Sequence, residues 1–69
     1  MQRHSVMSSN VESIGYDEGS QTLEVEFKNG AVYQYFDVPE QVYDGLRSAD
    51  SVGGFLAANI KGVYRYSRV

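Results

Sequence analysis

The feature that most constrains the fold is an Asn29-Gly30 pair between two segments in which apolar and polar residues alternate. Asn-Gly is a strong signal for a tight turn between antiparallel strands, because both residues tolerate the positive φ that such turns require. In the segment before the pair, Leu23, Val25 and Phe27 fall on one face and polar residues on the other. The sequence therefore predicts a central β-hairpin.

Two loop lengths are compatible with this turn. A two-residue loop would pair Val25 with Gln34 and bury that glutamine, and an unpaired buried amide costs roughly 1–3 kcal/mol. A three-residue loop, closed by Gly30 in the left-handed region, pairs Val25 with Tyr33 and keeps Gln34 on the outer face. The pattern of polar residues therefore favours the three-residue loop.

The chosen register decides where the aromatic residues of the second strand lie. It directs Tyr33 and Tyr35 toward the packed side of the sheet, and it leaves Val32 and Phe36 on the outer face. We interpret the two tyrosines as structural for this reason. A platform of exposed rings for stacking bases is the functional alternative.

The residues before the hairpin predict one further strand. Residues 10–17 alternate with Ile14 and Tyr16 on one face, and a four-residue turn at 18–21 would pair Ile14 with Val25. Residues 1–9 are polar and without periodicity, so we expect them to be loosely held. His4 lies in this segment and has no second ligand of its kind, which indicates solvated surface and no metal site.

Two short helices are predicted after the hairpin. The first opens at Pro39, and Asp50 or Ser51 caps the second. The Gly53-Gly54 pair in the second helix indicates close packing against another backbone. The apolar stripes are Val42, Tyr43, Leu46 and Ala49 in the first helix, and Val52, Phe55, Leu56, Asn59 and Ile60 in the second.

Residues 63–69 alternate and are rich in β-prone side chains, which favours a short final strand. A helix continued past Gly62 is the alternative, since Ile60 and Tyr64 are four residues apart. The predicted fold is α+β: a three-stranded antiparallel meander, with the C-terminal segment as the fourth strand, and two short helices packed on one face. Residues 1–69 form a single domain in this interpretation.

Composition and motifs argue against an enzyme. The 69 residues include no cysteine and one histidine, which excludes disulfides and thiolate metal sites. There is no Gly-rich phosphate loop and no Ser/His/Asp arrangement on a plausible scaffold, so we expect no catalysis, metal or cofactor. No apolar run resembles a signal peptide or a membrane span, and we expect a cytoplasmic monomer.

The charge is distributed unevenly along the chain. Residues 1–59 carry three basic and nine acidic side chains, whereas residues 60–69 carry three basic ones and no acid. The C-terminal segment interleaves these cations with aromatic rings, a pattern that suits a phosphate backbone with stacked bases. In the competing interpretation the rings pack on the sheet edge and the cations balance the acidic body. The candidate ligand-binding residues are Lys61, Tyr64, Arg65, Tyr66 and Arg68.

An ordered set of residues resembles the KTSC domain family, which is named for a segment at the C-terminus of some lysyl-tRNA synthetases. The set comprises Phe27, Gly30, Tyr33-Gln34-Tyr35, Val38-Pro39, Val42-Tyr43, Leu46, Ser51, Gly53, Phe55, Ile60 and Tyr64. The family's recognisable mark is Tyr-x-Tyr, here Tyr33 and Tyr35, and the resemblance runs from about Val6 to Val69. Ala57 stands where many members carry an asparagine. Members also occur as small stand-alone bacterial and phage proteins.

The resemblance implies little about activity, because the family's function is unknown and RNA binding is suggested by its association with synthetases. The sequence predicts a non-enzymatic binding module whose ligand is RNA, such as tRNA, held by the C-terminal basic-aromatic segment. The alternative is a protein-interaction adaptor that uses the outer sheet face or an edge strand, since Val32 and Phe36 place apolar side chains there.

Overall fold

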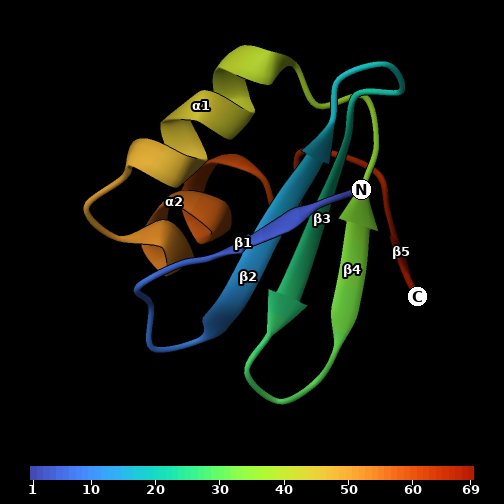
Figure 1. The fold of residues 1–69 in the computed structure, drawn as a ribbon. Coiled ribbons are helices and arrows are strands. Elements are labelled where there is room, and N and C mark those ends of the chain that lie inside the picture. Colours follow the sequence, from blue (N-terminus) through green and yellow to red (C-terminus); the bar gives the residue numbers. More distant parts are fainter.

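The computed structural model describes all 69 residues and shows an α+β fold, with a five-stranded antiparallel sheet and both helices on one face (Figure 1). The strands follow one another in the order β1-β2-β3-β4-β5. The elements are β1 Arg3–Ser5, β2 Val11–Asp17, β3 Thr22–Phe27, β4 Val32–Tyr35, α1 Glu40–Ser48, α2 Val52–Asn59 and β5 Tyr66–Arg68. The predicted class and the two helices are confirmed, but the expectation of three or four strands is wrong.

The β3–β4 hairpin has the predicted three-residue loop. Val25 pairs with Tyr33 across the two strands. The Phe27 N–H donates to the Ala31 carbonyl at 2.8 Å, which closes the loop. Gly30 has a φ of +94°, a conformation that costs other residues free energy. The polar pattern therefore identified the correct register.

The β2–β3 register is also confirmed, since Ile14 pairs with Val25 and Tyr16 with Leu23. A β-bulge between Val11 and Ser13 interrupts the strict alternation of β2. Because the bulge adds one residue, Val11 turns to the same side as Ile14 and is fully buried.

The fifth strand comes from residues 1–9, for which the sequence predicts no regular structure. Arg3 pairs with Gly15, and a Cβ at Gly15 would lie 2.7 Å from the Gln2 carbonyl oxygen. The Arg3 guanidinium reaches Glu24 at 3.3 Å and Glu26 at 3.5 Å. Periodicity missed β1 because all three of its residues are exposed and polar, and its contacts come from an ion-pair cluster on distant strands.

The two helices meet at a glycine, but not at the predicted one. A Cβ at Gly45 in α1 would lie 2.8 Å from the Phe55 ring of α2. The pair Gly53-Gly54 has no backbone of another element close by, so the close packing predicted there is wrong. The Phe55 ring thus accounts for a glycine in the middle of α1, where it weakens the helix by about 1 kcal/mol.

Ser51 caps α2, as one of the two predicted options. Its Oγ accepts a hydrogen bond from the Gly54 N–H at 3.0 Å. The helix ends at Asn59, and Gly62, with a φ of +78°, turns the chain back toward the sheet. Residues Tyr66–Arg68 then pair with β4, which confirms a final strand over a continued helix.

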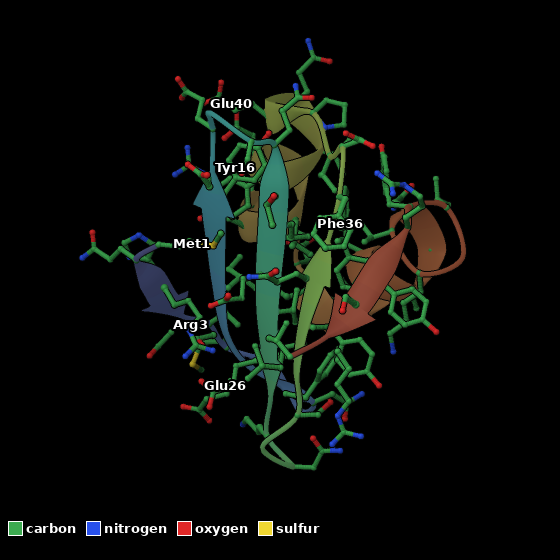
Figure 2. All side chains as sticks on the ribbon, turned by 90° about the vertical axis from the view of Figure 1, so that its right-hand side faces the viewer. Met1, Arg3, Tyr16, Glu26, Phe36 and Glu40 are labelled. Carbon is green, nitrogen blue, oxygen red and sulfur yellow. The ribbon has the colours of Figure 1, made fainter.

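The core lies between the helices and one face of the sheet, and the other face is open (Figure 2). On this open face the Gln34 side-chain amide donates to Glu24 at 2.9 Å. Val32 and Phe36 lie there half-buried, as expected. The core residues are Val11, Ile14, Leu23, Val25, Tyr35, Val38, Tyr43, Leu46, Val52, Leu56 and Ile60.

Candidate functional site

A hollow of about 540 Å³ lies on the helix side of β3, β4 and β5, beside the turn that follows α2. Five of the nine lining residues are hydrophobic, and none is acidic in a chain that carries nine acids. The lining residues are Phe27, Asn29, Ala31, Tyr33, Tyr35, Lys61, Gly62, Tyr66 and Arg68. We call this site the aromatic hollow.

Tyrosines from two neighbouring strands form one wall of the aromatic hollow. Tyr66 on β5 lies 5.6 Å from Tyr33 and 5.9 Å from Tyr35, measured between ring centroids. Phe27 meets Tyr33 edge to face at 5.7 Å. Tyr66 is nevertheless 61% exposed, so one of these rings is open to a ligand.

Tyr35 lies at the bottom of the hollow and is only 3% exposed. Its hydroxyl has no hydrogen-bond partner in the protein, whereas the hydroxyl of Tyr16 donates to the Val38 carbonyl. No fully buried side-chain polar atom lacks a partner, so the Tyr35 hydroxyl must open onto the hollow. Burial raises the pKa of Tyr35 above 10.0, and the neighbouring Tyr33 and Tyr66 add to the shift.

Two cations border the rings. The Lys61 ammonium lies 5.2 Å from the centre of the Phe27 ring, and Arg68 pairs with Tyr33 across β4 and β5. Neither makes an ion pair, whereas Arg3, Arg47 and Arg65 all do. Their charges therefore remain available to an anion, because no carboxylate of the protein neutralises them.

The structure brings together Lys61, Tyr66 and Arg68 of the five predicted ligand-binding residues. Arg65 lies on the open face, where it reaches Asp37 at 2.9 Å and covers the Phe36 ring at 5.8 Å. Tyr64 is half-buried against the core. The predicted segment is thus divided between two faces of the sheet.

Tyr33 and Tyr35 join the site, although sequence reasoning assigned them a structural role. They face the helix side as predicted, but the helices leave the end of β4 and β5 uncovered there. The alternation of side chains along a strand could have shown how the C-terminal segment divides, because it places Tyr66 and Arg68 on one face of the sheet and Arg65 on the other. Asn29 was also missed, and its position in the hairpin loop places it at the rim.

The model of the KTSC domain matches residues 7–69. The chain belongs to the KTSC domain family. The resemblance seen in its sequence is therefore confirmed.

Several relatives match this KTSC domain over most of its length. An uncharacterised protein of Stutzerimonas stutzeri is 44% identical, with 100% of this chain and 99% of the relative covered. The crystal structure of a KTSC domain protein from Yersinia pestis superimposes with a TM-score of 0.94 at 40% identity, covering 99% of this chain and 96% of that one. A lysine–tRNA ligase of Nostoc punctiforme is 36% identical over 59 residues, which are 86% of this chain but 10% of the ligase.

The opposite end of the KTSC domain has the opposite charge. Glu18, Glu40 and Asp44 line a smaller hollow of about 280 Å³ that also includes Tyr16. Burial raises the pKa of Tyr16, and Glu40 and Glu18 contribute next. No group of acidic or histidine side chains is arranged to hold a metal ion, and no helix has the length and apolar character to cross a membrane.

Proposed function

We propose that this KTSC domain is a non-enzymatic binding module for single-stranded regions of RNA, such as those of tRNA, and that the aromatic hollow is its site. One observation carries the proposal: the exposed ring of Tyr66 lines the same hollow as two cations, Lys61 and Arg68, that make no ion pair within the protein. Single-strand binders combine these elements, with rings that stack bases and cations that follow the phosphates.

The acidic net charge of −3 does not exclude this ligand. Interactions between exposed charges are screened beyond about 8–10 Å at physiological ionic strength. A phosphate at the hollow therefore responds to Lys61 and Arg68 more than to Glu18 and Glu40 at the other end. With two phosphate contacts, affinity should rely strongly on stacking and should be modest.

The family supports RNA as the ligand. A segment similar to this domain occupies about a tenth of the lysine–tRNA ligase of Nostoc punctiforme, a protein named for its action on tRNA. A ligase with an added RNA-binding surface would hold its substrate at a second point, and the added affinity would not require the domain to catalyse anything. This KTSC domain would offer the same binding surface.

Fluorescence anisotropy with a labelled single-stranded RNA tests the proposal at low salt. Lys61→Gln and Arg68→Gln should each weaken binding, and each should reduce the slope of log K against log salt by about 0.7. Arg65→Gln is the matched control, since it removes an equal charge from the other face and should have little effect. Equal effects of all three substitutions, or no binding at low salt, would contradict the proposal.

The alternative function, a protein-interaction adaptor, has less support. Val32 and Phe36 do lie on the open face, and β1 and β5 are edge strands. The Arg65 guanidinium covers the Phe36 ring, however, which reduces the apolar surface that a partner could bury. A pull-down whose recoveries change on Val32→Glu with Phe36→Ser would favour this alternative. Action in the cytoplasm stays a prediction of the sequence.

A further inference from the structure

The Tyr35 hydroxyl is the one feature of the aromatic hollow that neither folding nor phosphate binding uses. The ring is 97% buried in the core, yet its polar atom has no partner in the protein and opens onto the hollow. A phosphate held by the outer cations does not require a hydroxyl at the bottom of the site. Because the hydroxyl is open to solvent, water satisfies it in the free protein, and a ligand that replaces this water with its own hydrogen bond is selected by where its polar atoms lie.

We infer that the aromatic hollow receives one unpaired RNA base, which stacks on Tyr66 and directs its hydrogen-bonding edge to the Tyr35 hydroxyl, while Lys61 and Arg68 hold the adjoining phosphates. This inference rests on the proposed function and adds a selectivity to it. The domain should bind unpaired nucleotides, in single strands or loops, and discriminate against a continuous duplex.

The shape of the hollow suits an inserted base. Its volume of about 540 Å³ lies within the range of about 300–1,000 Å³ that is common for small-molecule sites. Tyr66 contacts Tyr33 and Tyr35 in tilted arrangements, at 40° and 41°, and still keeps 61% of its surface exposed. A base that enters along this face has an aromatic surface beside it and a polar atom ahead of it.

A duplex cannot use the same contacts. Its bases are stacked on one another, and their pairing edges are already occupied, so neither the face nor the edge of a base can reach a residue that is 3% exposed. A duplex could still approach Lys61 and Arg68 through its phosphates. Phosphate contact and base insertion are therefore separable, by ligand and by mutation.

One further group assists recognition of the base edge. The Tyr35 hydroxyl, like any protonated phenol, both donates and accepts hydrogen bonds, and Asn29 adds a second polar side chain to the hollow. The Asn29 side-chain oxygen accepts from the Ala31 N–H at 3.0 Å, which fixes this amide at the rim. Its NH₂ group remains free to donate to the ligand.

The test compares oligo(A), oligo(C) and oligo(U), each of about ten nucleotides, with a GC-rich RNA duplex that remains paired at the same low salt. At least one single strand should bind the native domain more tightly than the duplex. Tyr35→Phe should weaken binding of that strand roughly 2- to 10-fold, because it removes one hydrogen bond and retains the ring. Tyr64→Phe, which removes a hydroxyl outside the hollow, should leave the affinity unchanged.

The outcomes separate this inference from the proposed function. Equal binding of duplex and single strands, or an unchanged affinity of Tyr35→Phe, would overturn base insertion while leaving RNA binding through phosphates in place. Failure of every RNA to bind at low salt would overturn both. An amide spectrum of Tyr35→Phe that matches the native one, apart from neighbours of residue 35, shows that the fold is retained.

Discussion

Tyr35 and Tyr66 lie directly opposite each other on β4 and β5, with their ring centroids 5.9 Å apart, yet Tyr35 is 3% exposed and Tyr66 61%. The two rings share one face of one sheet and differ in what covers them. Tyr35 belongs to the core that the helices complete, whereas Tyr66 lies beyond them. The Tyr35 ring therefore contributes mainly to the stability of the fold, whereas the Tyr66 ring is largely accessible to solvent.

Truncation of these two tyrosines should therefore have opposite effects. Tyr66→Ala should change the free energy of unfolding by less than about 1 kcal/mol, because the side chain is exposed. The same change should weaken RNA binding roughly 5- to 100-fold, the worth of one stacked base. Tyr35→Ala should instead cost about 3 kcal/mol of stability, as a large core truncation does. Urea denaturation and anisotropy measure the two effects, and a strongly destabilised Tyr66→Ala would contradict the assignment.

The N-terminal strand should depend on the missing side chain at residue 15. A Cβ at Gly15 would lie 2.7 Å from the Gln2 carbonyl oxygen, and backbone cannot move aside as readily as a side-chain end. Gly15→Ala should therefore release β1 and abolish slow hydrogen exchange of its amides, while β3 and β4 remain protected. Gly19→Ala is the control, since its Cβ would meet only Asp17 Oδ1 at 3.8 Å. Retained protection in β1 would show that the close approach is not required.

The cap of α2 should contribute measurably to stability. Ser51 Oγ accepts from the Gly54 N–H at 3.0 Å, and loss of such a cap costs typically about 1 kcal/mol. Ser51→Ala should lower the free energy of unfolding by this amount in urea. Ser48→Ala, at the last position of α1, removes an exposed serine that caps nothing and should have little effect. A neutral Ser51→Ala would mean that the packing of the apolar residues of α2 suffices without the cap.

Stability should fall in alkaline solution through Tyr16. Burial raises the pKa of Tyr16 above 10.0 in the native state, so the unfolded state loses this proton at a lower pH. The contribution of the protonated Tyr16 hydroxyl to the free energy of unfolding is complete below pH 10.0 and is lost as the pH rises through the native pKa of Tyr16. Tyr16→Phe should show a smaller drop in unfolding free energy between about pH 9 and pH 12 than the native protein. Equal drops in the two proteins would contradict a raised pKa.

The loop of the β3–β4 hairpin was predictable because the two-residue and three-residue alternatives place Gln34 on different faces of the sheet. A two-residue loop would bury Gln34, and the structure instead places its amide on Glu24 at 2.9 Å, on the open face. The register of β2 followed from a second rule, since a slip by one residue would turn Ile14 and Tyr16 out of the core. One prediction thus used the cost of burying a polar group and the other the placement of apolar side chains on one face, and both can be seen in the sequence.

The first strand and the site were less predictable because their causes are tertiary. β1 pairs with β2, and its Arg3 also forms ion pairs with Glu24 and Glu26, which lie more than twenty residues away, so no local sequence pattern indicates these contacts. The role of Tyr33 depends on how far two short helices extend over the sheet. Periodicity gives the face of a residue, and only the assembled fold shows whether that face is covered.

The most direct test of the central claim is an NMR titration of the ¹⁵N-labelled domain with single-stranded RNA at low salt. Binding in the aromatic hollow predicts concentration-dependent shifts at Tyr33, Lys61, Tyr66 and Arg68, which line it together. The amide of Glu24, on the open face, should not shift. Shifts confined to the open face, or no shifts at any residue of the hollow, would contradict the account.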